Sequence, residues 1–507
     1  METFITNPSS DLFQASAAIT LLLALLLFLK LLFQYISLPL TLPPGPPAWP
    51  LLGSWLQFPH GLNSHSLSDL TRKYGEIFLL KLGQQNLLVI SSPDLAFEVL
   101  QRQGAQFGAR PRGLFFDTIT SKGQDLVFSD YGEHHIKVRR ICTPAFFSNK
   151  VIQQCRQGWE EEITINMDHL RHVIPGAATT GIIVKDHLQL MMYSIVYRMM
   201  FSRRFEGLDD PVYLELQRLN ENLRRIVVTS KTHHSDFFPC LKPFLKGYLS
   251  KVWSANQERL TFFRKAFIDD HRKRQLRHIK SGVDDILEAH ANGELSEETM
   301  LYLVQNINVA AIDTTVSVME WGVAELVNNR HVQEDLRREL DTVLGKGVPV
   351  SEPDLTKLPY LQAVVKELLR LHMVVPLLLP HQNLKPTKIG AYDIPAGCKV
   401  YVNARGMAND PEYWNNPEAF DPNRFLESKL EMRGSHMHFM PFGSGRRSCP
   451  GMAMAVVVLS LVLGRMVQEY ELLPFEGEKL DLTAMGGIID AHIIAEKSRI
   501  MLRPRNT

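Results

Sequence analysis

Cysteine is scarce in this chain, and its copies lie far apart. Only five occur among 507 residues, namely Cys142, Cys155, Cys240, Cys398 and Cys449. An odd number without short spacings fits neither a disulfide framework nor a zinc or iron-sulfur site, and it indicates a reducing compartment for the main body. Net charge is small as well, at +1. It therefore gives no sign of a nucleic-acid partner.

Apolar residues, in contrast, are abundant and regularly spaced. A hydrophobic content of 45% over this length can bury a large core, in about three domains or in one large helical domain. Periodicity predicts helices over 66–74, 94–103, 131–147 and 184–205, and short strands over 77–82, 86–90, 394–397 and 400–402. Residues 83–85 predict a hairpin turn, and residues 104–123 predict a long loop that carries Phe115 and Phe116.

The N-terminus carries the longest apolar run. From 15 to 33 only Ser16, Thr20 and Lys30 interrupt it, and a proline-rich stretch follows in place of a cleavage site. We predict a membrane anchor in residues 1–36, a stiff linker in 37–50 and one catalytic body in 51–507. The acidic Glu2 and Asp11 before the run and Lys30 at its end place the body on the cytoplasmic side. A buried core helix is the alternative.

A glycine-rich loop over 442–451 contains Cys449. The glycines predict a tight, shaped loop, and helical apolar spacing begins after Gly451. Cys449 therefore precedes a helix start, where free N–H groups favour a thiolate. A lone cysteine can serve as the single axial ligand of a haem, and an inert buried cysteine is the alternative.

A second chemical centre lies in a long predicted helix over 296–328. Ser296 is a plausible N-cap, and about 30 apolar-rich residues span roughly 45 Å. Within it, small residues at 310–311 open a flat face beside Asp313 and Thr314. An acid next to a hydroxyl can relay protons, although a threonine bonded back to its own helix is the alternative.

Two further patterns concern charge. Glu367 and Arg370 share a helix face and could form a routine surface pair. The basic residues Lys137 and Arg140 in the segment 131–147 predict either a solvated face or a docking patch for an acidic redox partner.

Taken together, these patterns resemble the cytochrome P-450 family over about the whole chain. The loop matches Phe-x-x-Gly-x-Arg-x-Cys-x-Gly, the long helix matches the family's acid-threonine segment with Ala311 for the common glycine, and Glu367 and Arg370 match Glu-x-x-Arg. The resemblance implies a mainly α fold with a small β portion (α+β). It also implies a single large helical haem domain behind an N-terminal transmembrane helix, in the endoplasmic reticulum membrane and facing the cytosol.

The resemblance implies roles for the loop and its surroundings. Cys449 would ligate the iron of haem b, with Phe442 and Gly451 beside it in the loop. Arg447, Arg139 and His135 would contact the haem propionates, and His135 stands where the family usually has tryptophan.

The resemblance also assigns the reacting and supporting groups. Thr314 would hydrogen-bond the bound dioxygen and Asp313 would relay protons, while Glu367, Arg370 and Arg424 would hold the haem loop. Electrons would come from NADPH through a separate membrane reductase.

Four segments, 188–193, 243–249, 306–311 and 320–326, narrow the resemblance to the plant cinnamate 4-hydroxylase subfamily. This implies hydroxylation of trans-cinnamate to 4-coumarate with O2. The candidate substrate residues are Phe115, Phe116, Asn306, Ala310, His372, Val375, Met485 and Ile488. The subfamily has arginine in place of His372 and lysine in place of Met485, so two basic anchors for the substrate carboxylate are replaced.

Three rival functions remain open at this point. The enzyme could oxidise a different, less anionic aromatic or lipophilic substrate, or it could be a reductase-independent haem-thiolate isomerase of hydroperoxides. A non-enzymatic membrane scaffold without haem is the third, and a reduced-carbonyl absorption spectrum would exclude it.

Overall fold

A computed structural model describes residues 40–58, 62–177, 180–228, 236–274, 281–482 and 499–505, together with Ser16, Ile19, Thr20, Leu22, Leu25 and Leu26. Helices dominate it and the strands are short, so the predicted α+β class is confirmed.

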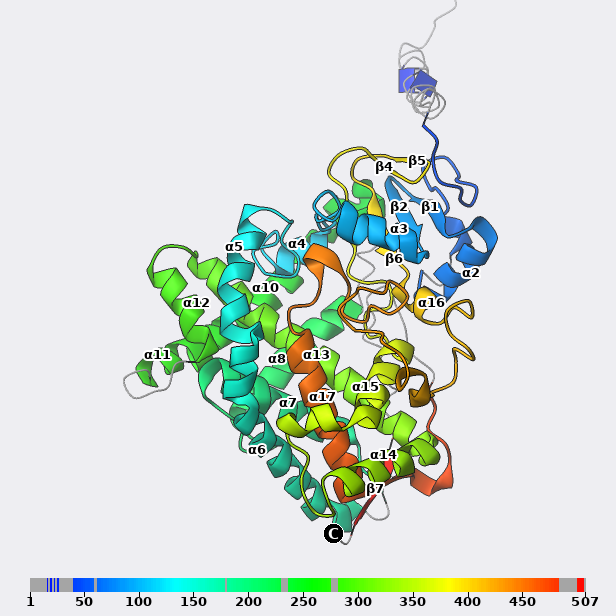
Figure 1. Cartoon of the computed structure of the whole chain (residues 1–507). Coiled ribbons are helices and arrows are strands. Elements are labelled where there is room, and N and C mark those ends of the chain that lie inside the picture. Colours follow the sequence, from blue (N-terminus) through cyan, green and yellow to red (C-terminus); the bar gives the residue numbers. More distant parts are fainter. Residues whose placement is uncertain are drawn as a thin grey trace, which may run out of the picture.

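Two strands lie near the start of the described chain, a long series of helices follows, and the remaining strands lie after residue 380 (Figure 1). The α-helices are α2 (Ser64–Tyr74), α3 (Pro93–Phe97), α4 (Leu114–Ile119), α5 (Glu133–Cys142), α6 (Asn149–Val173), α7 (Val184–Phe201), α8 (Pro211–Val228), α10 (Lys246–Phe263), α11 (Asp270–Arg274), α12 (Gly282–Ala291), α13 (Glu297–Asn328), α14 (Arg330–Val343), α15 (Pro359–Leu371), α16 (Ala404–Ala408) and α17 (Met452–Glu469). The strands are β1 (Ile77–Leu82), β2 (Gln85–Ile90), β3 (His381–Gln382), β4 (Thr387–Ile389), β5 (Tyr392–Ile394), β6 (Lys399–Val402), β7 (Tyr470–Pro474) and β8 (Ile500–Pro504).

The largest sheet has the strand order β1-β2-β6-β3. β1 and β2 form the predicted antiparallel hairpin, with Leu79 opposite Leu88, and Gly83 takes the positive φ of 57° that the turn requires. β6 then pairs with β2 in parallel, although about 300 residues separate them in sequence. The sheet, with α2, α3 and α16, forms the small β side of the molecule (Figure 1).

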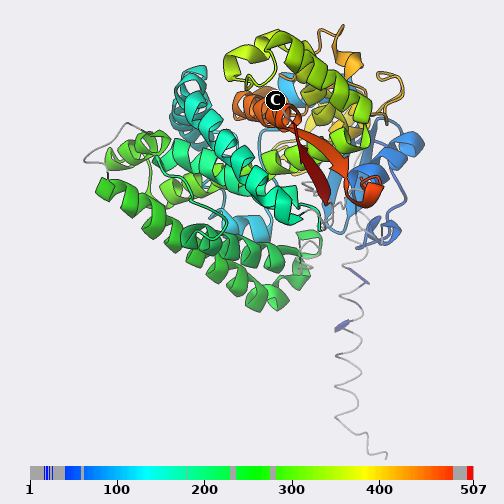
Figure 2. The same cartoon turned by 90° about the horizontal axis from the view of Figure 1, so that it is seen from below.

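The helical side is organised around α13. Its N-terminus is capped as predicted, because Ser296 Oγ accepts a hydrogen bond of 3.1 Å from the Thr299 N–H. α13 packs against α7, α10 and α17 within one continuous apolar core. Figure 2 shows the β7–β8 pair near the C-terminal end of α17, and β7 packs against both α13 and α17.

The predicted loop over 104–123 was wrong in part, because its centre folds into α4. The N–H of Leu114, at the start of α4, donates to Asp236 Oδ1 at 3.1 Å. A residue 122 positions away in the sequence thus supplies the acceptor that this helix N-terminus lacks. α4 also packs against α10. A one-turn helix held by distant partners leaves no periodic signal in its own sequence.

The predicted anchor falls mostly outside the described residues. The six described positions within 1–36 are helical, and the large side chains among them, such as Ile19 and Leu22, are exposed. Among the described helices, only α17 is long and apolar enough to cross a bilayer, and it lies in the core next to α13. The division into anchor, linker and body therefore stays a prediction.

Candidate functional site

The Cys449 loop is shaped by glycine and tied to its own backbone. Gly445 has a φ of 69°, and a Cβ there would lie 2.0 Å from the Leu100 carbonyl oxygen, so only glycine fits. The Cys449 N–H donates to the Phe442 carbonyl at 2.9 Å. Gly451 is the N-cap of α17, and a Cβ on it would lie 3.9 Å from the Cys449 sulfur.

The surroundings of Cys449 suit a metal-bound thiolate. Burial raises the pKa of the thiol, whereas the N–H groups of Gly451 and Met452 and the charge of Arg139 lower it. The side chain is nevertheless open to a water-sized space. The sulfur is therefore accessible, and Cys449 would be the residue that holds a haem iron.

A second candidate surface lies on α13, and we call the accessible residues within 309–314 the α13 opening. Most of this helix is buried, yet Val309, Ala310 and Asp313 expose their side chains and Thr314 is half-buried. The Thr314 hydroxyl donates to the Ala310 carbonyl at 2.6 Å, which is the back-bonded geometry weighed above. Its oxygen lone pairs are still available to accept a hydrogen bond. The α13 opening thus combines small residues with an acid and a hydroxyl on the exposed part of an otherwise buried helix.

A cluster of cations lies beside the Cys449 loop. Arg447 donates to the carbonyls of Gly108 and Ser129 and to His135 Nδ1, the last at 3.0 Å. Both terminal nitrogens of Arg139 lie 3.2 Å from the Ser448 carbonyl oxygen. Burial lowers the pKa of Arg447 to about 10, because the charged form loses water.

His135 has a buried ring nitrogen without a hydrogen-bond acceptor among the described residues. Arg447 can only donate, so His135 Nδ1 accepts and the neutral ring carries its proton on Nε2. Burial, together with Arg447 and Arg139, lowers the pKa of His135 to about 3, which keeps the ring neutral. Nε2 is buried without a hydrogen-bond partner among the described residues. An N–H donor in a cationic cluster fits a carboxylate such as a haem propionate.

Two members of this cluster were not predicted from the sequence. Arg110 donates to the carbonyls of Leu379 and Pro380, both at 2.8 Å, and burial lowers its pKa to about 9. His381 bonds to the Phe107 carbonyl at 2.9 Å, and burial with the charge of Arg110 lowers its pKa to about 3. No local pattern distinguishes either residue, since their meeting depends on segments about 270 residues apart.

The predicted supporting residues meet in the core. The Arg370 guanidinium pairs with both oxygens of the Glu367 carboxylate at 2.7 and 2.8 Å, and both side chains are fully buried. Arg424 Nε reaches Glu367 Oε1 at 3.0 Å. Arg370 also donates to the carbonyls of Ala408 and Pro417. The triad therefore ties α15 to the long segment that leads to the Cys449 loop.

The predicted substrate residues lie in several places. Phe116 stacks on Phe128 with ring centroids 4.5 Å apart, and Phe115 packs against the small apolar cluster of α8 and α10. Asn306 is half-buried on α13, one turn before the exposed Ala310. Val375 packs at the edge of the main core. Met485 and Ile488 lie outside the described residues.

The structure ties His372 to other protein groups. Its Nε2 lies 2.6 Å from Glu325 Oε1, and its ring stacks on Trp321 with centroids 4.0 Å apart. Burial lowers the pKa of His372, against the opposing effect of Glu325. Its predicted role at the substrate remains a prediction.

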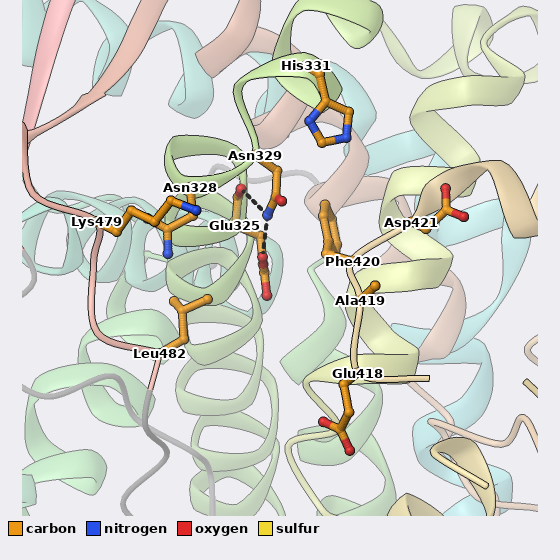
Figure 3. A pocket seen from close by; sticks show the side chains of 10 residues that line it. All are labelled: Glu325, Asn328, Asn329, His331, Glu418, Ala419, Phe420, Asp421, Lys479 and Leu482. Carbon is orange, nitrogen blue, oxygen red and sulfur yellow. Dashed lines mark hydrogen bonds between the residues drawn. The ribbon is translucent and has the colours of Figure 1, made fainter. Parts of the chain in front are cut away.

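A cleft of about 440 Å³ lies at the C-terminal end of α13 (Figure 3). Asn329 on its wall donates to the Glu325 carboxylate at 2.7 Å, and Lys479 and Leu482 close one side. The cleft shares no residue with the predicted haem site. It adjoins the start of segment 483–498, which lies outside the described residues, so we assign it no function.

Comparisons with known proteins identify the family of the chain. The Cytochrome P-450 family model matches residues 43–492. Trans-cinnamate 4-monooxygenase of Catharanthus roseus is 50% identical over 473 residues, covering 92% of this chain and 93% of the relative. The enzyme of that name from Arabidopsis thaliana is 49% identical over 476 residues, covering 92% of this chain and 94% of the relative.

A solved structure shares the fold. A zebrafish cytochrome P-450 with abiraterone superposes with a TM-score of 0.73 at 24% identity, covering 87% of this chain and all of the other. The chain thus shares the fold of a solved cytochrome P-450, and the segment matched by the family model includes the Cys449 loop, the α13 opening and the Glu367 triad. The chain belongs to the cytochrome P-450 family.

Proposed function

We propose that the protein hydroxylates trans-cinnamate at the 4-position to give 4-coumarate, with O2 and with NADPH electrons delivered by a reductase. The observation that carries this is the identity of about half of all residues, over 92% of the chain, with enzymes that bear this activity in their names. Haem b held by Cys449 would supply oxygen activation when bound.

The residues of this chain divide the remaining work. The N–H groups of Gly451 and Met452 and the charge of Arg139 stabilise the Cys449 thiolate. His135, Arg447 and Arg110 offer donors and positive charge to the two haem carboxylates. Asp313 passes protons toward the reacting oxygen past Thr314, whose hydroxyl is oriented by the Ala310 carbonyl.

The substrate is an anion, so its carboxylate needs a donor or a cation. Asn306 is such a donor on α13, and the exposed Ala310 leaves room for an aromatic ring beside it. With His372 paired to Glu325, its side chain adds little positive charge to the site. We therefore expect the carboxylate to rely on neutral donors, with affinity that falls when Asn306 is replaced by leucine.

The deciding experiment is a spin-state titration of the purified haem protein. Trans-cinnamate should shift the iron from low to high spin, and incubation with NADPH and reductase should convert it to 4-coumarate. A shift with a neutral cinnamyl ester or aldehyde, but none with cinnamate, would favour the less anionic substrate class. Conversion of a hydroperoxide without NADPH would favour the isomerase.

We also propose that the protein sits on the endoplasmic reticulum membrane with its catalytic body in the cytosol. The support is an apolar surface formed by 49–56 and the turn 239–245. Trp49 and Phe244 are 64% and 84% exposed, and the ring centroids of Trp55 and of Phe237, which lies just before 239–245, are 5.1 Å apart. Microsomal fractionation of the protein with and without residues 1–36 tests the anchor. If the protein that retains residues 1–36 is recovered in the soluble fraction, the anchor is contradicted.

A reductase partner follows from the NADPH-dependent chemistry. The basic residues Lys137 and Arg140 on α5 are the docking candidates, although both contact Glu294. Charge reversal at these positions should raise the reductase concentration needed for half-maximal turnover, with a weaker effect at high salt.

A further inference from the structure

A small polar cavity lies behind the α13 opening, enclosed by α7, α8, α10 and α13. Its lining residues are Tyr193, Tyr197, Asn220, Arg259, Phe263, Asn308, Val309 and Asp313. The space available to the centre of a water molecule is about 10 Å³, enough for roughly one ordered water. Asp313 belongs both to this cavity and to the exposed face of α13, so it stands at the boundary between the two.

Arg259 of α10 is the unusual member of this cavity. Only 5% of the residue is exposed, and its Nε is buried without a hydrogen-bond partner. The structure describes no carboxylate within 4.0 Å of its guanidinium, which lies 5.8 Å from the centroid of the Phe263 ring. A buried cation without a close partner is costly, so such an arginine indicates a nearby negative group or water that it serves.

Electrostatics identifies the group that Arg259 serves. Burial lowers the pKa of Arg259, and the neighbouring Tyr193, Tyr197 and Asp313 oppose that effect. In turn, burial and then the charge of Asp313 raise the pKa of Tyr193, so this phenol stays neutral. Among the described residues that line the cavity, Asp313 is therefore the one carboxylate that acts on Arg259.

The other polar groups of the cavity leave hydrogen bonds for a water molecule. Asn220 Nδ2 donates to the Tyr193 hydroxyl at 2.7 Å, which leaves the Tyr193 proton free to donate. Tyr197 Oη, Asn220 Oδ1 and Asn308 Oδ1 are buried without a described partner. These atoms can hold one water in the usual manner of a buried site. Asn220 on α8 is half-buried, whereas the lining residues of α7 and α10 are buried.

We propose that Arg259 is a positioning residue for Asp313, and that the cavity water supplies protons to Asp313 from the α8–α10 side. Protonated Asp313 releases its proton toward Thr314 and regains one from the water, which is replenished from solvent past Asn220. The positive charge of Arg259 attracts the carboxylate toward this water between transfers. The inference rests on the proposed oxygenase chemistry, because only that chemistry consumes protons at this face.

The test compares Arg259→Met, Arg259→Lys and Tyr193→Phe with the wild type, all as full-chain haem proteins. The control is Arg264→Met, because Arg264 follows α10 directly, pairs with Glu297 at 2.8 Å and is half-exposed. Each variant is assayed for substrate-induced spin shift, product formed per NADPH consumed, and the solvent isotope effect on turnover.

Arg259→Met should leave the spin-shift Kd unchanged and lower the product per NADPH by about tenfold, with a larger solvent isotope effect. Arg259→Lys keeps the charge and should recover more than half of the coupling, and Arg264→Met should behave as the wild type. Tyr193→Phe removes one hydrogen-bond donor with little change in shape, so it should lower the product per NADPH less than Arg259→Met does. It also tests the cavity if Arg259→Met retains no haem.

A second readout is independent of turnover. The infrared band of the protonated Asp313 carboxyl, assigned with Asp313→Asn, should persist to higher pH in Arg259→Met, because loss of a cation raises the carboxyl pKa. Among the described residues that line the cavity, the titratable groups beside Asp313 are Arg259, Tyr193 and Tyr197, and α8 contributes the neutral Asn220. Wild-type coupling together with an unmoved band in Arg259→Met would overturn the proposal. Failure of the substrate assignment is seen separately, as wild-type enzyme that turns over another spin-shifting ligand but not cinnamate.

Discussion

Replacing Glu367 by glutamine should destabilise the protein strongly. Both Glu367 and Arg370 are fully buried, and the Glu367 carboxylate accepts from Arg370 at 2.7 and 2.8 Å, from Arg424 at 3.0 Å and from the Asp421 N–H at 3.0 Å. An amide presents only one oxygen and turns an NH2 group toward guanidinium donors. The two arginines then keep their carbonyl acceptors but share one neutral amide oxygen in place of a carboxylate.

The magnitude follows from breaking a buried pair on one side only. Such changes cost about 3–5 kcal/mol, because the remaining charge loses its partner without regaining water. Arg370 keeps its bonds to the carbonyls of Ala408 and Pro417, so we expect the lower half of that range, about 3–4 kcal/mol. This is a large share of the 5–15 kcal/mol that typically separates folded from unfolded protein.

The assay is urea unfolding of the haem protein, followed by the reduced-carbonyl spectrum and by circular dichroism. The matched control is Glu334→Gln, which removes a 2.9 Å pair with Arg330 at an exposed site, 48% and 69% exposed for the two side chains. That change should cost less than about 1 kcal/mol. The reasoning would be refuted by equal losses in the two variants, or by a Glu367→Gln variant within about 1 kcal/mol of the wild type.

Three further predictions concern the ligand, the haem carboxylates and pH. Cys449→Ser should abolish the haem-thiolate absorption spectrum and all turnover, whereas Cys240→Ser, at an exposed cysteine, should leave both unchanged. His135→Leu should release haem to an acceptor protein about tenfold faster, because one buried donor to a propionate is lost, and an unchanged release rate would contradict that role. Burial raises the pKa of Glu320 on α13 to about 7, so the folded form binds this proton more tightly than the unfolded chain and loses stability as pH rises. Glu320→Gln should therefore be about 3 kcal/mol more stable than the wild type at pH 8 and equal to it near pH 4, and parallel stability curves would contradict the assignment.

Much of the architecture was predictable because its signals are local. The hairpin of β1 and β2, the N-cap of α13 at Ser296 and the start of α17 after Gly451 agree with the periodicity and the capping residues. The Cys449 loop was also evident from spacing alone. Each of these features depends on residues a few positions apart.

The tertiary structure alone decided which distant residues meet. α4 depends on Asp236 at its N-terminus, Arg110 donates to the carbonyls of Leu379 and Pro380, and Arg259 of α10 shares a cavity with Asp313. Backbone periodicity records only whether a residue faces the core, and it does not record which buried charge stands opposite. The amino-acid sequence by itself determined the reactive groups of this protein, while packing over long separations decided the electrostatic field around them.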